Sequence, residues 1–342
     1  MPFFRELIGQ GRSIRILQSF IRNKALPQAL LFEGDEGIGK RKTAEIFAQA
    51  LFCRLAKAVK DSKDEEIEPC GHCLTCRKMQ DGNHPGYSVV EPEGPSIKID
   101  QIRALQSQIV IKPFDGPKKI VLIDPAEKMN DAAANSLLKT LEEPPPYAII
   151  ILISARASAL RPTLLSRCQK ITFQPLSLSH VISILMEKKG WTMSEARLVA
   201  AFANGRLGEA FGLEVETARA LDEDRHRLVA DGDLFQAAAD FGKDAEGFDA
   251  ALSYLFNWFR DLLVIKSLPG ISHLDPSMLL YSWRYEETKR WAAAMDSDEI
   301  LNILNMLQAL HHAQSRNVNR QLSLETLLLN LQEMRRGSPA AR

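Results

Sequence analysis

The chain has 342 residues, of which 45% are hydrophobic and 25% charged, which excludes a disordered or fibrous protein and favours two or three domains. Lys plus Arg and Asp plus Glu both number 43, so the net charge is zero and no overall field attracts nucleic acid. The opening ten residues show no basic region followed by an apolar run, and no stretch approaches the roughly 20 apolar residues that span a bilayer. We therefore expect a cytoplasmic protein with no membrane partner.

Short apolar runs alternate with helical patterns through the first half of the chain. The runs that predict buried parallel strands are residues 29–32, 87–90, 120–123, 148–153 and 171–173. Between them, Ile102, Leu105 and Ile109 recur at helical spacing, and residues 135–143 predict a helix that ends before Pro144. This alternation predicts an α/β domain over residues 1–174, with a parallel sheet between two helical layers.

Beyond residue 175 the strand signals disappear and the chain becomes rich in leucine and alanine at helical spacing. Gly205 and Gly208 interrupt the pattern and predict a boundary near Leu213. The predicted divisions are a small helical unit at 175–213, an all-α domain at 214–336 and a flexible tail at 337–342. Two apolar stripes should bury against other helices, namely Leu252, Leu255, Phe256, Phe259, Leu262 and Leu263, and the stretch from Leu322 to Leu331.

The first predicted strand leads into Gly34-Asp35-Glu36-Gly37-Ile38-Gly39-Lys40, which has the spacing of a P-loop that opens a helix. Backbone amides of such a loop can hold phosphate oxygens, so the candidate nucleotide-binding residues are Gly34, Gly37, Gly39 and Lys40. The full pattern places Ser or Thr after the lysine because a hydroxyl ligates Mg²⁺. Arg41 stands at that position and cannot ligate a cation.

A second strand ends at Asp124, as the acidic strand of a nucleotide-hydrolysing site does, and Asp124 is a further candidate in the nucleotide site. The next residue is Pro125, which has no carboxylate to act as a general base. These two losses predict a degenerate site in which ATP binding is retained at most and hydrolysis is poor or absent. The alternative is an active ATPase that tolerates Arg41 and uses Glu127 as its base.

Four of the five cysteines cluster at Cys53, Cys70, Cys73 and Cys76, whereas Cys168 stands apart. Four thiolates can close a tetrahedral Zn²⁺ site with no open position for water. We therefore expect a structural zinc ion that holds an insertion at about residues 53–76 against the helix after the P-loop. An iron–sulfur cluster, free thiols and a nucleic-acid-reading knuckle are the alternatives, and no interleaved aromatic and basic residues favour the last of these.

Residues 134–145, Ala-Asn-Ser-Leu-Leu-Lys-Thr-Leu-Glu-Glu-Pro-Pro, and the later Ser166-Arg167-Cys168 strongly resemble the clamp-loader subunits of the AAA+ family. The opening Ile8-Gly9-Gln10, the P-loop remnant, the cysteine insertion and the helical tail occur in the same order, so the resemblance covers nearly the whole chain. It implies a AAA+ P-loop domain, a small helical lid and a C-terminal helical collar for oligomerisation. The damaged nucleotide motifs resemble a non-hydrolysing loader subunit more than the gamma or tau ATPase.

The resemblance implies that Arg167 is an arginine finger that acts in trans on the ATP of a neighbouring subunit. A planar, permanently charged guanidinium suits that task because it can stabilise charge on the γ-phosphate. Hydrolytic relatives end a Gly-x-x-Arg stretch of the lid with a sensor arginine, whereas this chain has Gly208 there, with Arg206 two residues earlier. The implied partners are the loader delta and gamma or tau subunits, the DNA polymerase III holoenzyme and, through the assembly, the sliding clamp and primer-template DNA.

Overall fold

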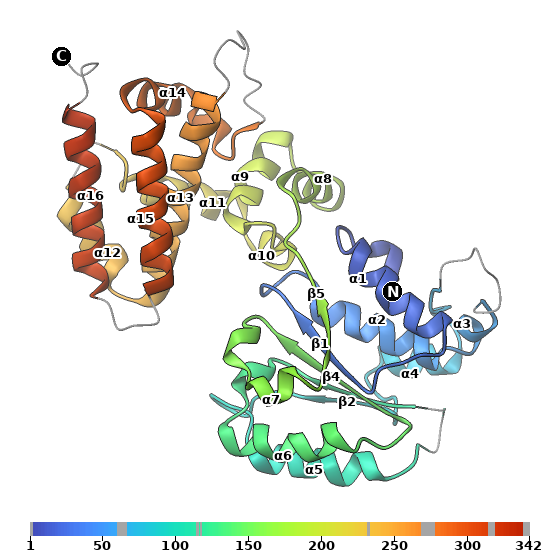
Figure 1. Ribbon diagram of the computed structural model, residues 1–342. Helices are drawn as coiled ribbons and strands as arrows, with labels where there is room; N and C mark the ends of the chain where they lie inside the picture. The colour runs from blue at the N-terminus through green and yellow to red at the C-terminus, as the bar shows by residue number, and fades with distance from the viewer. Residues whose placement is uncertain are drawn as a thin grey trace. The chain divides into compact units, whose positions relative to one another are not determined.

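The computed structural model contains two compact units, each described separately. It describes residues 3–59, 67–113, 116, 118–230, 233–267, 278–313 and 319–337. The first unit comprises Met1–Ile184 and Ala203–Gly212, and the second comprises Leu185–Phe202 and Leu213–Arg342. The strands labelled in Figure 1 all belong to the first unit. The predicted divisions near residues 174, 213 and 336 stay predictions.

The first unit is built on a sheet of five parallel strands in the order β2-β3-β4-β1-β5. The strands are β1 Ala29–Glu33, β2 Tyr87–Val90, β3 Lys119–Ile123, β4 Ala148–Ser154 and β5 Gln169–Thr172. Each predicted strand is present, so the predicted parallel sheet is confirmed. Every residue of β4 is buried, which explains why its sequence is continuously apolar rather than alternating.

Helices cover both faces of the sheet, and alternate strand residues face the two layers (Figure 1). Leu30 and Phe32 join the core beneath one layer, whereas Ala29 and Leu31 join the core beneath the other. The first layer contains α1 Gly11–Arg22, α2 Lys40–Phe52, α3 Arg54–Val59 and α4 Leu74–Gln80. The second contains α5 Ile99–Val110, α6 Asp131–Glu142 and α7 Pro162–Leu165. The predicted three-layer α/β arrangement is therefore confirmed.

The helix α6 ends before Pro144 as predicted, but it begins at Asp131 and not at the predicted residue 135. Asn130 is its N-cap, and its Oδ1 accepts a hydrogen bond of 2.8 Å from the Ala133 amide. Gln106 on α5 donates to the Ser136 carbonyl and to the Thr140 hydroxyl, which fixes α5 against α6. The prolines that follow end the helix after Glu142. The Glu142 side chain is about half exposed.

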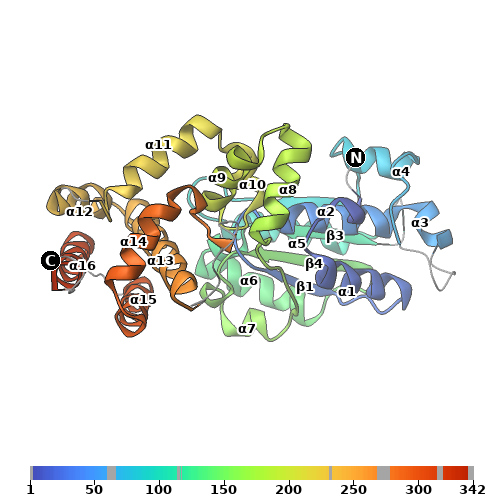
Figure 2. The same cartoon turned by 90° about the horizontal axis from the view of Figure 1, so that it is seen from above.

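The helical part of the chain contains no strand among its described residues. Two helices, α8 Leu178–Lys189 and α9 Met193–Ala203, carry residues of both units, and α10 Leu207–Gly212 belongs to the first. The second unit contains α11 Val215–His226, α12 Leu234–Gly242, α13 Ala245–Ser267, α14 Tyr285–Ala294, α15 Ser297–Ala313 and α16 Arg320–Gly337 (Figure 2). The central helix α13 packs against α14 and α15, while α12 packs against α16.

The two predicted apolar stripes are confirmed in part. Leu255 is fully buried on α13, but Phe256 is 42% exposed, so its predicted burial is wrong. The buried residues of α13 lie on the side of the helix that carries Leu255 and Trp258. Because an α-helix rotates by roughly 100° per residue, Phe256 lies beyond the edge of that side. In α16, Leu324, Leu327, Leu328 and Leu331 are buried, whereas Leu322 and Leu329 are exposed. None of the helices in the described part of the chain has the length and apolar character needed to cross a membrane.

Candidate nucleotide pocket, cysteine centre and surface arginine

The predicted P-loop residues lie together in one turn between β1 and α2. Gly34, Gly37 and Gly39 have φ angles of 137°, 75° and 94°, which explains why glycine occupies these positions. Lys40 opens α2 and is buried, and its Nζ donates to the carbonyls of Gly34 and Asp35. Glycines with positive φ angles also occur in the backbone turns that bind anions in other proteins.

The helix α10 rests directly on this loop. The amide of Gly208 donates a hydrogen bond of 3.0 Å to the carbonyl of Gly37. A Cβ added at Gly208 would lie 3.2 Å from that same oxygen, so glycine permits the close approach of the two backbones. Arg206 pairs with Glu209 at 2.7 Å beside the loop. Gly208 therefore has a packing role, because a larger residue would press on the Gly37 carbonyl.

Charged groups gather around the mouth of the loop, which opens into a pocket of about 580 Å³. Asp124 follows β3, and its Oδ2 lies 3.7 Å from Arg41 Nη1. Burial raises the pKa of Asp124, although Arg41 and Lys40 oppose that shift. Burial likewise lowers the pKa of Lys40, against the attraction of Asp124 and Glu127. These cations and carboxylates therefore compensate one another within the pocket.

Polar side chains after β3 and at the end of β4 accept hydrogen bonds from backbone amides. Oε1 of Glu127 accepts a hydrogen bond of 2.9 Å from the Ala155 amide, while among the described residues its buried Oε2 has no donor. Ser154 is fully buried, and its Oγ accepts from the Arg156 amide at 3.1 Å. Glu127 is thus fixed at the end of β4, and Pro125 offers no carboxylate beside Asp124. This geometry gives no support to Glu127 as a mobile general base.

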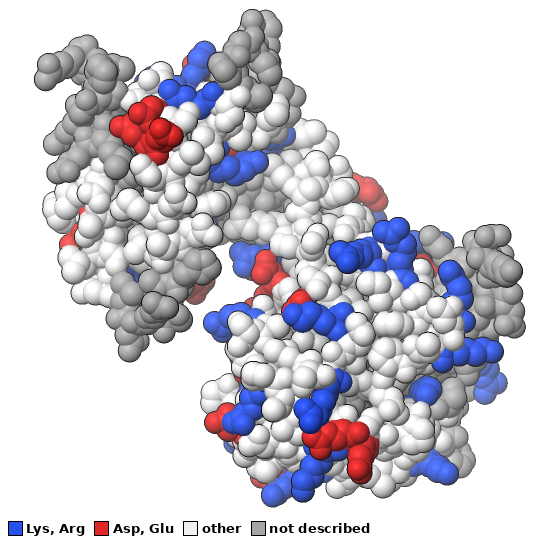
Figure 3. All heavy atoms as spheres, viewed as in Figure 1, with Lys and Arg blue, Asp and Glu red and all other residues white. Residues whose placement is uncertain are grey.

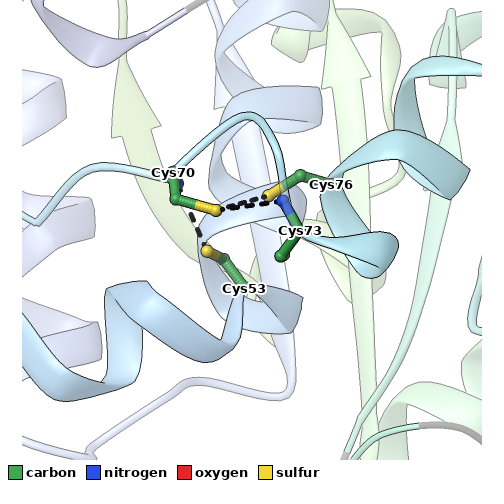
Figure 4. A group of neighbouring side chains, drawn as sticks. All are labelled: Cys53, Cys70, Cys73 and Cys76. Atoms are coloured by element: carbon green, nitrogen blue, oxygen red, sulfur yellow. Dashed lines mark hydrogen bonds between the residues drawn. The ribbon is translucent and has the colours of Figure 1, made fainter.

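The four clustered cysteines converge as their spacing predicts (Figure 4). Cys53 follows α2, while the other three occupy the turn that leads into α4 and its first residues. All four Sγ atoms lie within 4.8 Å of one another, and Cys70 Sγ lies 3.9 Å from Cys76 Sγ. Tetrahedral ligation with Zn–S bonds of about 2.3 Å requires sulfur separations of about 3.8 Å. The cluster can therefore hold a metal ion.

Backbone amides also point at the sulfur atoms. The amides of Ala56 and Cys70 donate to Cys53 Sγ at 3.4 and 3.2 Å, and the amide of Cys73 donates to Cys70 Sγ at 3.4 Å. Burial acts to raise the pKa of the Cys73 thiol, but the Cys76 amide and neighbouring thiols outweigh it and hold the pKa at about 6. Burial outweighs such donors at Cys53 and Cys76, whose pKa values are raised, so the metal-binding thiolate form is favoured most clearly at Cys73.

Arg167 lies in the turn between α7 and β5, and its side chain is 35% exposed. Its Nη2 pairs with Glu142 Oε1 at 2.6 Å, and its Nη1 donates to the Thr163 carbonyl at 2.9 Å. The guanidinium is therefore held from the neighbouring helices yet stays accessible. Cys168 beside it is half-buried, and burial raises its pKa to about 11, so it is a poor thiolate.

The surroundings of the cysteine turn do not favour a nucleic-acid reader. Figure 3 shows one face of the molecule, on which Lys and Arg side chains are scattered, with Asp and Glu side chains beside some of them. Near the cysteine turn, His72 Nδ1 is bonded to the Cys70 carbonyl and Leu74 is exposed. A single exposed leucine is not a stacking platform for bases.

Two carboxylates beside the predicted site residues were not anticipated from the sequence. Glu91 forms a hydrogen bond with Arg41 across 50 positions of the chain, and Glu142 pairs with Arg167 across 25. The one available signal for Glu91 is its place directly after a predicted strand, because parallel strands bring their carboxyl ends to one edge. Glu142 lies in a helix that the sequence predicted, but nothing local indicated its partner.

Comparisons with known proteins find similarity to subunits of DNA polymerase III. The family model described as "DNA polymerase III, delta subunit" matches residues 9–177. The DNA polymerase III subunit delta' of Bacillus subtilis is 33% identical over 337 residues, covering 95% of this chain and 96% of that protein. The subunit delta' of Pseudomonas aeruginosa is 43% identical over 142 residues, or 41% of each chain. A DNA polymerase III gamma subunit-related protein of Thermotoga maritima aligns with a TM-score of 0.39 and 20% identity, covering 95% of this chain and all of that one.

Proposed function

Because the chain belongs to the family of DNA polymerase III delta' subunits, we propose that it is the largely non-hydrolysing subunit of a clamp loader. The similarity to the Bacillus subtilis subunit extends over 95% of the chain, which supports a role for the whole protein and not for one domain. In this role it assembles with delta and gamma or tau subunits within the DNA polymerase III holoenzyme. The assembly then loads the sliding clamp on primer-template DNA during replication.

The observation that carries the proposal is the chemistry around Asp124. Hydrolysis in P-loop proteins needs a hydroxyl for Mg²⁺ and a group that positions the attacking water. Here Arg41 replaces the hydroxyl and Pro125 follows Asp124, while Glu127 is engaged with the Ala155 amide. Both requirements fail at once, so the pocket is a degenerate nucleotide site in which Gly34, Gly37, Gly39 and Lys40 remain as phosphate-binding groups.

The cation that the chain contributes to catalysis is Arg167. A guanidinium completes a neighbour's site only if it is exposed and held in place before the neighbour arrives. The ion pair with Glu142 and the bond to the Thr163 carbonyl supply that orientation. We assign to Arg167 the stabilisation of charge on the γ-phosphate of ATP bound to the adjacent gamma or tau subunit.

The cysteine cluster supports a structural Zn²⁺ ion. Cys53, Cys70, Cys73 and Cys76 provide four sulfur ligands, which leave no position for a catalytic water. The ion holds the end of α2 to the beginning of α4, on the face of the sheet that also carries α1. Zinc here secures the layer that contains the P-loop helix and takes no part in chemistry.

Two measurements on purified protein test the proposal. The isolated chain is assayed for steady-state ATP hydrolysis, and it is mixed with candidate delta and gamma or tau subunits for co-purification. We expect negligible turnover by the isolated chain and a stable complex whose ATPase rate responds to primed DNA. Brisk hydrolysis by the isolated chain, or failure to enter the complex, would contradict the proposal.

A further inference from the structure

Arg41 stands at the chain position where a P-loop protein has the hydroxyl that ligates its magnesium ion. The residue after the P-loop lysine normally offers a hydroxyl to the ion, and the acidic residue after the second strand orients the ion's water ligands. In this chain Arg41 Nη1 is bonded to Glu91 Oε1 and lies 3.7 Å from Asp124 Oδ2. A guanidinium thus takes the contact with Asp124 that magnesium would otherwise make.

The sheet brings two carboxylates to this one side chain, and the helix α2 brings a third. Val90 pairs with Ile123 in parallel register, so Glu91 and Asp124 follow neighbouring strands at the same edge. Glu45, one turn along α2, bonds Arg41 Nε at 3.2 Å. The hydrogen bond to Glu91 is the main reason that the pKa of Arg41 is raised further, so the group stays charged at every physiological pH.

Magnesium does not fit these residues. The ion needs oxygen ligands in an octahedron, whereas a guanidinium has five donors and no lone pair to offer. Its positive charge, in contact with Asp124, also repels a divalent cation from that carboxylate. Phosphate does fit, because the loop glycines keep positive φ angles and Lys40 remains at the base of the pocket of about 580 Å³.

We propose that the Arg41 guanidinium permanently takes the place of the divalent cation, so that the pocket binds a nucleoside di- or triphosphate without Mg²⁺. Lys40 offers its positive charge to the phosphates, and Asp124 stays paired with Arg41 instead of ordering metal-bound water. The inference rests on the proposed function only in treating the pocket as an inherited nucleotide site. Arg41 thereby makes the pocket accept the nucleotide that is free of Mg²⁺.

A fluorescent ATP analogue titrated into the full chain tests this inference, once with excess EDTA and once with excess MgCl2. We expect the two Kd values to agree within about threefold, which is less than about 1 kcal/mol. In Arg41→Thr, Mg²⁺ should tighten binding by at least about tenfold, or about 1.4 kcal/mol. The matched control is Lys42→Thr, which removes the same charge from the next residue and should leave binding independent of Mg²⁺.

Thermal melting checks that Arg41→Thr is folded, which is expected because exposed ion pairs contribute at most about 1 kcal/mol. Lys40→Ala should abolish binding and so place the analogue in the P-loop. The inference fails if Mg²⁺ tightens wild-type binding tenfold, if EDTA abolishes that binding, or if Lys40→Ala binds normally. It also fails if Arg41→Thr stays indifferent to Mg²⁺. None of these outcomes measures hydrolysis or assembly, so the proposed loader role stands or falls separately.

Discussion

Arg167 and Glu142 form an ion pair in which Nη2 lies 2.6 Å from Oε1, and the pair joins the turn after α7 to the last residue of α6. The helix that carries Glu142 ends there because prolines follow, and Arg167 lies in the short turn before β5. The two residue patterns that resemble clamp loaders are therefore physically coupled. We therefore expect Glu142 to position the guanidinium that we propose acts on the ATP of a neighbouring subunit.

This coupling predicts the effect of Glu142→Gln. The amide oxygen still accepts a hydrogen bond but no longer attracts the guanidinium by charge, so Arg167 becomes less well oriented. Turnover at the neighbouring site should fall by roughly 2- to 10-fold, less than in Arg167→Ala. Adding Glu142→Gln to Arg167→Ala should cause no further loss. A second, independent loss in the double variant would show that Glu142 acts without Arg167.

Replacing one sulfur ligand should release the metal. Cys76→Ser removes a buried ligand, so we expect bound zinc to fall from one equivalent to nearly none by elemental analysis. The first unit should lose on the order of 2 kcal/mol of stability, a drop of about 4–8 °C in Tm. Cys168→Ser is the matched control and should keep its zinc. Wild-type protein prepared without chelator that held less than half an equivalent of zinc would count against the site.

The contact between α10 and the P-loop predicts opposite effects for two glycines of one helix. A Cβ at Gly208 would press on the Gly37 carbonyl, whereas a Cβ at Gly212 meets nothing within 4 Å. Gly208→Ala should therefore destabilise the protein by about 1 kcal/mol through overpacking. Gly212→Ala should be neutral or stabilise it by up to about 1 kcal/mol. Denaturant unfolding of both variants decides the matter, and equal free energies of unfolding would show that the contact is unimportant.

In the second unit, Asp261 is fully buried and accepts hydrogen bonds from the amides of Leu280 and Tyr281 at 3.0 and 2.8 Å. Asp261→Ala leaves both amides without that acceptor, so we expect a loss of about 2–4 kcal/mol in the free energy of unfolding. Arg260→Ala removes only its half-exposed charge partner and should cost less than about 1 kcal/mol. Comparable losses in the two variants would mean that the charge pair, and not the backbone bonds, matters.

Local patterns predicted much of the fold because they report on local physics. Apolar runs bounded by turn residues become strands covered on both faces, as the complete burial of β4 illustrates. Cysteine spacing likewise predicted the cluster, because three ligands lie within a single turn and the first helical residues after it. Asn319 likewise satisfies the beginning of α16 by accepting a hydrogen bond of 3.1 Å from the Leu322 amide.

Contacts between distant segments could not be predicted in the same way. Arg41 forms its hydrogen bond with Glu91 because β2 and β3 are neighbours in the sheet. No local sequence pattern predicts the order of the strands. The exposure of Phe256 has a similar origin, since its helix faces several others and the direction of the buried arc depends on all of them. Local sequence thus located Arg41 and Arg167 but not the carboxylates that orient them.

The ATPase rate of the complete loader, reconstituted with wild-type chain or with Arg167→Ala in the presence of primed DNA, tests the central claim most directly. Arg161→Ala, which breaks the exposed pair with Asp131, is the control for losing a surface arginine. We predict that the Arg167→Ala chain assembles normally. Turnover at the neighbouring ATP site should fall by roughly 10³-fold. The total ATPase rate should therefore fall by at least the fraction that this site contributes in the wild-type loader. An unchanged rate in a fully assembled Arg167→Ala complex would contradict the account.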